Sequence, residues 1–298
     1  MSREIDVMHL GRDRVICAYE VDGLIVDPGP TTGLETLLEG LGGAEPRGLL
    51  LTHIHLDHAG ASGRLVQRFP ELTVYVHERG APHLLDPERL LKSARQLYGD
   101  DLERLWGEVI AVPEANVRVL TGGETIEDGV RVEYTPGHAS HHVSYLHAAT
   151  GEAFVGDVAG VRIPPTDHVL PPTPPPDIDL EAWEQSLRTL EGWGPSALCL
   201  THFGRVRDVG GHLLRMREGI ARQGERGRAH GQEAFEEAIE AEVREAADGD
   251  EATAESFLQA APPYTLYLGL ERYWRKKAER EGAAVGQGEG AQAPATRP

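Results

Sequence analysis

Apolar positions in the first quarter of the chain follow two different periods. Apolar runs at 15–19 and 23–26, each bounded by polar residues and turn formers, predict two paired strands. Leucines at i, i+3, i+4 and i+7 spacing over 34–41 predict an amphipathic helix that Gly42 ends. The same reasoning predicts strands at 49–51 and 72–76 and a helix at 58–69. This alternation of strand and helix is typical of an α/β sandwich.

The middle of the chain returns to strands after a helical insertion at about 79–108. Residues 130–134 alternate apolar and polar side chains, as in a half-buried strand. The proline-rich stretch 163–177 predicts a stiff surface loop, because proline fixes φ and removes a backbone donor. Asp179 is expected to cap a helix through Leu190. The other predicted strands lie at 117–120, 125–126, 143–146, 153–155 and 197–200, the last being the final strand.

The pattern divides the chain into three parts. Residues 1–205 are expected to form one α/β domain that contains the insertion. Residues 206–281 show helical spacing with few strand signals, so they predict a helical C-terminal extension. Residues 282–298 are rich in Gly, Ala, Gln and Pro, and we expect a disordered tail there.

Composition and charge exclude several classes of protein. The formal net charge of −19 argues against a nucleic-acid partner, because phosphate contacts need a surface of Lys and Arg. No apolar run is long enough to span a membrane, and the polar start does not resemble a secretory signal. The only cysteines, Cys17 and Cys199, cannot build a disulfide framework. We therefore expect a cytoplasmic protein.

Four metal-ligand side chains follow the predicted strand at 49–51. They are His53, His55, Asp57 and His58. Imidazole nitrogen and carboxylate oxygen suit zinc and its borderline-hard neighbours. Four such groups exceed what one ion easily uses in a tetrahedral shell. The spacing therefore indicates two ions side by side.

Three more ligand-type residues stand at the ends of later predicted strands. His138 follows the strand at 130–134, Asp157 follows 153–155, and His202 follows 197–200. Turns at strand ends are where α/β folds place their chemistry.

The set of ligand-type residues resembles that of the metallo-β-lactamase superfamily, over roughly residues 5–205. The resemblance rests on the order and spacing of His53, His55, Asp57, His58, His138, Asp157 and His202. It implies a four-layer αββα sandwich with the metals in a cleft between the sheet edges. It also implies which residues hold which ion. His53, His55 and His138 would hold the first metal, Asp57, His58 and His202 the second, and Asp157 would bridge them.

Elementary chemistry agrees with a hydrolase. Two divalent ions bring four positive charges, and Asp57, Asp157 and a hydroxide bring three negative ones. The pKa of water beside a zinc ion falls to about 7, so hydroxide is available at neutral pH. Asp57 can orient that hydroxide and accept a proton, which makes it the expected catalytic residue. The ions are expected to be zinc, and the same ligands also accept manganese or iron.

Asp157 narrows the branch that the chain resembles. True β-lactamases of the family tend to lack this aspartate, and diiron flavoproteins carry glutamate where His55 stands. The nucleases of the family need basic surfaces or a large extra domain. The glyoxalase-II-like thioesterases and the lactonases share all seven ligands. The resemblance thus implies hydrolysis of a small ester-like molecule: a thioester, a lactone or a phosphodiester.

Two other functions stay open. Persulfide dioxygenases have the same scaffold but use one iron, held by residues that match His53, His138 and Asp157. Alternatively, the metal site could be structural, with the C-terminal helices serving a partner. A homodimer through these helices is a further expectation, and whether they cap the cleft or form that interface is left open.

Overall fold

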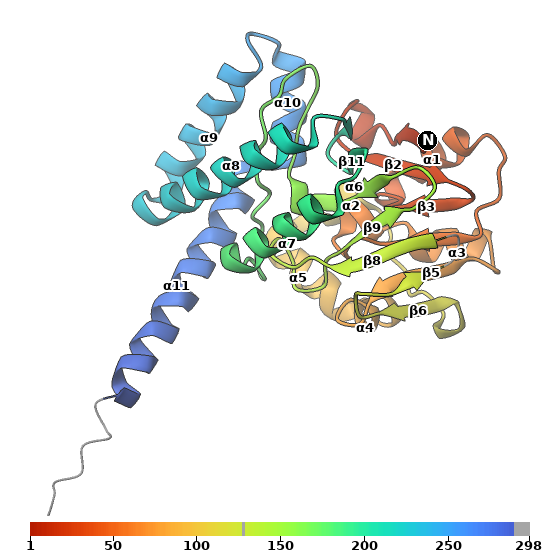
Figure 1. Cartoon of the computed structure of the whole chain (residues 1–298), viewed down its shortest axis with the longest axis horizontal. Coiled ribbons are helices and arrows are strands. Elements are labelled where there is room, and N and C mark those ends of the chain that lie inside the picture. Colours follow the sequence, from red (N-terminus) through yellow and green to blue (C-terminus); the bar gives the residue numbers. More distant parts are fainter. Residues whose placement is uncertain (127–128, 289–298) are drawn as a thin grey trace, which may run out of the picture.

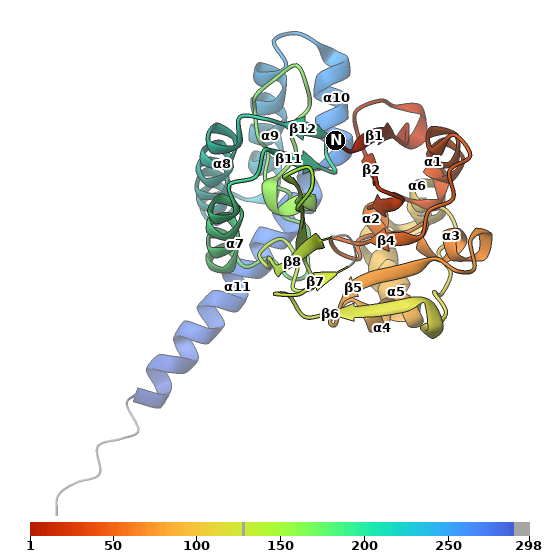
Figure 2. The ribbon, with the colours of Figure 1, turned by 45° about the vertical axis from the view of Figure 1, so that its right-hand side comes forward.

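The chain folds into two facing sheets with helices on both outer sides. The structure is a computed structural model, and it describes residues 1–126 and 129–288. Within these residues each sheet has six strands. Figure 2 shows the four layers in order: helices α1 and α3–α6, the N-terminal sheet, the C-terminal sheet, and helices α7 and α8. The expected four-layer αββα sandwich is therefore confirmed.

The N-terminal sheet has strand order β1-β2-β3-β4-β5-β6. Its first three strands are antiparallel, and β3 to β6 are parallel. The pairing of β2 with β3 is the one expected from the apolar runs near residues 15–26. The strands are β1 Arg3–Asp6, β2 Cys17–Val21, β3 Leu24–Val26, β4 Gly48–Leu50, β5 Thr73–His77 and β6 Val117–Leu120.

The C-terminal sheet has strand order β12-β11-β10-β9-β8-β7. Only β10 and β11 are parallel, and helix α7 connects them. The expectation that 197–200 is the final strand was wrong, because β12 follows it and pairs with β11. The strands are β7 Thr125–Ile126, β8 Val130–Tyr134, β9 Val143–His147, β10 Glu152–Phe154, β11 Ala197–Leu200 and β12 Gly204–Val206.

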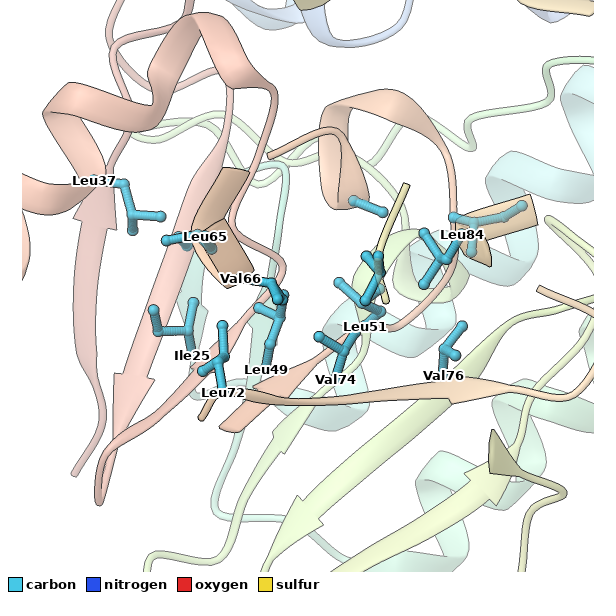
Figure 3. Close-up of a cluster of buried hydrophobic side chains, with 14 of the residues drawn as sticks. Ile25, Leu37, Leu49, Leu51, Leu65, Val66, Leu72, Val74, Val76 and Leu84 are labelled. Atoms are coloured by element: carbon cyan, nitrogen blue, oxygen red, sulfur yellow. The ribbon is translucent and has the colours of Figure 1, made fainter. Parts of the chain in front are cut away.

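The central strands, such as β3, β4, β10 and β11, are buried on both faces, and alternate side chains enter different cores. Tyr19 and Leu50 from the first sheet meet Tyr145 and Phe154 from the second in the core between the sheets. Their sequence neighbours point outward; Leu49, for example, packs under the outer helices. Figure 3 shows this outer core of the N-terminal sheet. Apolar residues at consecutive positions therefore mark strands covered on both sides.

Six α-helices that the structure describes, most of them in segments predicted to be helical, cover the N-terminal sheet and the cleft beside it. Helix α1 ends at Gly42 in the left-handed conformation, as expected. The predicted insertion is present as three helices. The helices of this half are α1 Leu34–Leu41, α2 Leu56–Ala59, α3 Ser62–Arg68, α4 Ala81–Leu85, α5 Glu88–Tyr98 and α6 Leu102–Trp106.

The helix predicted at 58–69 is broken into α2 and α3. The amide of Ala61 donates to the carbonyl oxygen of Gly29 at 3.0 Å, and the amide of Gly29 donates to that of His58 at 3.1 Å. These bonds to the turn after β3 replace the regular helical ladder. A Cβ atom on Gly60 would lie 2.4 Å from the oxygen of Leu56, so the close approach requires glycine there. The short helix α2 thus presents its side chains separately from α3.

The helices after residue 178 cover the C-terminal sheet and extend beyond it. Asp179 caps α7 by accepting from the amide of Ala182, as expected. Trp183 is fully buried, and its Nε1 donates to the carbonyl oxygen of Val158 at 2.7 Å. The helices are α7 Leu180–Trp193, α8 Val209–Ala229, α9 Gln232–Ala246, α10 Glu251–Ala260 and α11 Pro263–Gly288. In Figure 1 the last part of α11 projects away from the sandwich.

The proline-rich stretch 163–177 is irregular, but it is not a surface loop. Val169 and Leu170 are buried, and Leu170 packs with Phe235 of α9 and Leu266 of α11. The prediction of a surface loop was wrong because the pattern of one segment does not show what folds over it. The C-terminal helices bury their apolar faces on this loop.

Helix α11 also runs further than predicted. The disordered tail was expected from residue 282, yet the helix continues to Gly288. Alanines in the sequence 282–285 favour continuation of a helix. The rest of the expected tail, 289–298, lies outside the described residues. None of the helices that the structure describes is long and apolar enough to cross a membrane.

We predict that Gly269→Ala destabilises the protein although alanine favours a helix, because α11 packs tightly at this position. A Cβ atom on Gly269 would lie 1.9 Å from the carbonyl oxygen of Thr173, in the buried loop. The variant should lose about 1–3 kcal/mol of unfolding free energy. Gly192→Ala in α7 is the matched control, since nothing lies within 4 Å of its added methyl group. It should gain about 0.5–1 kcal/mol. Urea unfolding measures both, and equal values would contradict this account of α11.

Candidate metal centre

The seven predicted ligands come together at one edge of the sandwich. His53 and His55 follow β4, and Asp57 and His58 lie in α2. His138 lies in the connection between β8 and β9. Asp157 follows β10, and His202 follows β11. Both sheets therefore contribute ligand-type side chains from their strand ends.

Three imidazoles form the first group. His55 Nδ1 lies 3.0 Å from His53 Nε2 and 2.9 Å from His138 Nε2. Three nitrogen atoms facing one point cannot all be satisfied by hydrogen bonds to one another, since a neutral imidazole has one donor and one acceptor. A metal ion is the group that three such lone pairs can share.

Asp57, His58 and His202 form the second group. His202 Nε2 lies 3.4 Å from Asp57 Oδ2, and His58 Nε2 lies 3.8 Å from the same oxygen. Both histidines are buried, whereas the Asp57 side chain is 21% exposed. This group therefore has one anionic oxygen at its accessible side.

Asp157 lies between the two groups. Its Oδ2 is 3.4 Å from His138 Nε2, in the first group. Its Oδ1 is 3.2 Å from His58 Nε2 and 3.5 Å from His202 Nε2, in the second. The two oxygens of one carboxylate thus face two different sets of nitrogen atoms. The resemblance implied this bridging position for Asp157.

The chemistry of the donor atoms fits metal ions. His58 Nε2, His202 Nε2 and Asp157 Oδ1 are buried and have no hydrogen-bond partner within 1–126 and 129–288. Leaving a buried polar group unsatisfied costs about 1–3 kcal/mol, so three of them in contact need a common partner. In each of three overlapping groups, the potential ligand atoms lie within 4.8 Å of one another. The groups are His53–His55–His138, His53–His58–Asp157 and Asp57–His58–His202.

The outward-facing nitrogen of several imidazoles is fixed by an oxygen. His202 Nδ1 donates to the carbonyl oxygen of Val15 at 2.6 Å, and His138 Nδ1 donates to that of Pro172 at 2.9 Å. His58 Nδ1 donates to Asp27 Oδ2 at 2.8 Å. A proton on Nδ1 leaves the lone pair on Nε2, which faces the centre. Such outer bonds fix both the tautomer and the orientation of a metal-binding histidine.

Asp27 directly follows the predicted strand at 23–26, and it was not among the predicted site residues. This buried carboxylate accepts from the amide and the hydroxyl of Thr52, at 2.8 and 2.7 Å. It also accepts from the hydroxyl of Thr201 at 2.9 Å. The available signal was an aspartate directly after a predicted strand. Its partners are far apart in sequence, so the pattern alone could not show its role.

Burial and charge oppose each other at the centre. Burial tends to lower the pKa of His58, but Asp157, Asp57 and Asp27 together raise it well above its usual value. Burial tends to raise the pKa of Asp157, but His58 and two other imidazoles hold it well below its usual value. The carboxylates around the second group therefore stabilise positive charge at its centre. In the first group, burial and then His138 lower the pKa of His55 to about 3, which leaves its lone pair free.

A cavity of about 630 Å³ opens on this cluster. Its floor includes His55, Asp57 and Asp157. Helices α5 and α6 of the insertion form one wall, and the end of α10 with the first half of α11 forms another. The leucine, tyrosine and tryptophan residues of the lining are Leu56, Leu90, Leu97, Tyr98, Leu105, Trp106, Tyr264, Leu266 and Leu268. Residues of α10 and α11 thus lie over the cleft. The sequence had left open whether the C-terminal helices cap the cleft, and these two helices do.

The segment that contains the site matches a known protein family. Residues 16–202 match the metallo-beta-lactamase superfamily. The chain belongs to this superfamily. The matched segment includes all seven ligand-type residues and ends at His202. The insertion lies within it, and helices α8 to α11 lie outside.

Curated relatives in the metallo-β-lactamase superfamily match only part of their own length. A metallo-beta-lactamase fold-containing protein, ST1585, of Sulfurisphaera tokodaii is 32% identical over 164 residues, which cover 53% of this chain and 60% of that protein. A hydroxyacylglutathione hydrolase of Trichodesmium erythraeum is 32% identical over 142 residues, 45% of this chain and 44% of that protein. This chain therefore aligns with less than two thirds of either relative.

Solved structures of the superfamily share the fold. The crystal structure of ST1585 from Sulfolobus tokodaii has a TM-score of 0.62 at 26% identity, covering 74% of this chain and 85% of that chain. A metallo-beta-lactamase family protein from Thermus thermophilus, TTHA1429, has a TM-score of 0.58 at 23% identity, covering 88% of this chain and 89% of that one. The second likeness supports the fold alone.

We predict that Asp27→Asn weakens metal binding without unfolding the protein. The amide keeps the size of the side chain but removes the charge that fixes the His58 imidazole. Loss of such an outer partner typically lowers metal affinity about 10–100-fold. Competition with a chromogenic chelator measures the zinc affinity. Asp22→Asn is the control, since Asp22 is exposed and faces His147 instead. Unchanged affinity in Asp27→Asn would show that the carboxylate does not orient a ligand.

Proposed function

We propose that this protein is a dinuclear metal-dependent hydrolase that acts on a small ester-like substrate. The observation that carries the proposal is the position of Asp157, whose two oxygens face two separate groups of imidazoles. A site for one ion would need only one oxygen of Asp157, and it would not need the second group. The ligands would be divided as the resemblance implies, with His53, His55 and His138 in one set.

When bound, two divalent ions supply hydroxide at neutral pH and stabilise negative charge on a reacting oxygen. The chain provides the groups that orient and receive protons. Asp57 lies at the accessible side and lines the cavity. Burial tends to raise its pKa, but His58 and His202 lower it well below its usual value, so the carboxylate is ionised. The ionised carboxylate can therefore accept a hydrogen bond from the attacking water and orient it.

The cavity supports a substrate with an apolar part. Its walls carry leucines and aromatic rings, and Arg272 and Arg275 of α11 lie among its lining residues. An ester of a small apolar acid or alcohol, with an anionic group toward these arginines, fits this distribution. The relatives named hydroxyacylglutathione hydrolase support a thioester as the substrate. A lactone and a phosphodiester are the other ester-like substrates that we propose. The ions are proposed to be zinc, with manganese or iron as the alternatives.

The persulfide dioxygenase expected as the alternative would use His53, His138 and Asp157 alone. It would leave Asp57, His58 and His202 gathered around one point without a task. The hydrolase accounts for both groups and is therefore preferred. A homodimer through the C-terminal helices and a cytoplasmic location stay predictions.

We predict about two metal ions per chain, by elemental analysis of protein purified without added metal. The metal-loaded protein should hydrolyse at least one member of a panel of thioesters, lactones and phosphodiesters. His55→Ala should lose about one ion per chain, because it removes a ligand from one group only. Asp57→Asn should lower kcat by at least about 100-fold, because it removes the charged oxygen that orients the attacking water. His230→Ala is the control, since this histidine is exposed at the end of α8.

Other results of these measurements would contradict the hydrolase or the role of Asp57. About one iron per chain with oxygen consumption would replace the hydrolase by the dioxygenase. Two ions with no turnover across the panel, together with unfolding on chelation, would favour a structural site. Full activity in Asp57→Asn would contradict the role of this carboxylate.

A further inference from the structure

His9 is a buried histidine that the metal centre does not use. It lies in the connection between β1 and β2, and only 2% of it is exposed. It is separated in sequence from every ligand-type residue, yet it lines the same cavity as Asp57 and Asp157. Its ring stacks on Trp106 of helix α6, with centroids 5.2 Å apart and planes at 4°. A segment near the N-terminus and the helical insertion thus form one aromatic wall beside the centre.

Both rings of this wall have polar atoms without partners. His9 Nδ1 and Trp106 Nε1 are buried and make no hydrogen bond to any residue in the described part of the chain. Each unsatisfied group of this kind costs about 1–3 kcal/mol. A leucine or phenylalanine would fill the same space without that cost. Two unsatisfied polar groups side by side in a cavity are groups that a bound molecule can satisfy.

The loop holds His9 in place by backbone contacts. Gln259 Nε2 of α10 donates to the carbonyl oxygen of His9 at 2.9 Å. Arg12 Nε donates to Gln259 Oε1 at 2.8 Å, which fixes that amide. Met8 and Leu10, on either side of His9, have left-handed φ angles of 50° and 53°. Two non-glycine residues in this region are unfavourable, so contacts with the rest of the protein must hold the loop here.

We propose that His9 and Trp106 bind the substrate directly. In this arrangement their rings hydrogen-bond an oxygen atom next to the scissile group, while the apolar part of the substrate packs on Leu97 and Tyr98. Indole can only donate, and imidazole can donate or accept, so a hydroxyl, carbonyl or carboxylate oxygen satisfies both. The substrate class is therefore an ester of an apolar oxy-acid, such as an aromatic hydroxy acid. This inference rests on the proposed function, because it takes the reacting bond to lie at the metal centre.

The imidazole acts here as a neutral group. Burial lowers the pKa of His9 to about 4, and the nearby carboxylate of Asp57 only partly opposes this shift. A neutral ring can accept from a hydroxyl or donate to a carbonyl without bringing a further positive charge near the ions. His9 is accordingly a binding residue, and no proton transfer is assigned to it.

A stacking role alone would give the same burial, so the test must separate ring shape from ring nitrogen. His9→Phe keeps an aromatic ring against Trp106 but removes both nitrogen atoms. Trp106→Phe removes the indole donor. His168→Phe is the matched control: His168 also has a buried Nε2 that makes no hydrogen bond within the described residues, although Glu242 Oε1 lies 3.6 Å away, and its ring packs on Phe257 at 5.6 Å. It does not line the cavity.

Two readouts on the zinc-loaded full-length protein decide the inference. The first is kcat/KM for the best substrate of the panel, which His9→Phe should lower about tenfold, mainly through KM, since one hydrogen bond is lost. The second is calorimetric binding of phenyllactate and of phenylpropanoate, which lacks the hydroxyl group. Wild-type protein and His168→Phe should prefer phenyllactate, and His9→Phe should lose about tenfold in that preference. Trp106→Phe should show a smaller loss of the same sign.

The outcomes keep this inference separate from the proposed function. Equal kcat/KM and equal preference in wild type and His9→Phe, at equal metal content, would overturn the role of His9 and leave the hydrolase intact. No turnover of any panel member would count against the hydrolase, and calorimetry would still decide on His9. Failure of phenyllactate to bind wild-type protein would overturn the substrate class. Loss of metal from His9→Phe would also overturn the inference, because the residue would then support the ions.

Discussion

The buried carboxylate of Asp27 joins the two sheets at the edge where the ligand-type residues gather. It accepts from Thr52 after β4 in one sheet and from Thr201 after β11 in the other. Its remaining contact fixes the His58 imidazole. The carboxylate accepts four hydrogen bonds, one on Oδ1 and three on Oδ2, so the charge can be buried at tolerable cost. The positions of His53 and His202, each next to one of these threonines, depend on the same anchor.

The alternation of side chains allowed most of the fold to be predicted from the sequence. Apolar runs such as Leu49 to Leu51 predicted strands, and leucine spacing predicted α1 with its end at Gly42. Strand β12 was missed because it is short and contains Arg205. That arginine is held by Glu4 and Glu152, from distant parts of the chain. Elements that depend on such long-range pairs carry no local pattern.

The same distinction applies to the site. Residues 53–58 are neighbours in sequence, so their ligand spacing could be recognised directly, and the strand-end positions of the other three followed from the resemblance. Asp27 and His9 could not be found in that way. The role of Asp27 depends on its contact with Thr201, and that of His9 depends on its contact with Trp106. The burial of the loop at 163–177 was missed for the same reason, since only the folded helices α9 to α11 cover it.

The sandwich supplies the metal centre, and the two helical additions define the space above it. Without α5, α6, α10 and α11 the cluster would open to solvent, because these helices make the walls of the cavity. The connection between β1 and β2 links the two tasks. Its Val15 accepts from His202, and its His9 lies against Trp106. Any shift of this loop would therefore move a ligand-type histidine and a cavity wall together. One segment thus contacts both a ligand-type histidine and the cavity wall, and Gln259 of α10 holds it beside the left-handed Met8 and Leu10.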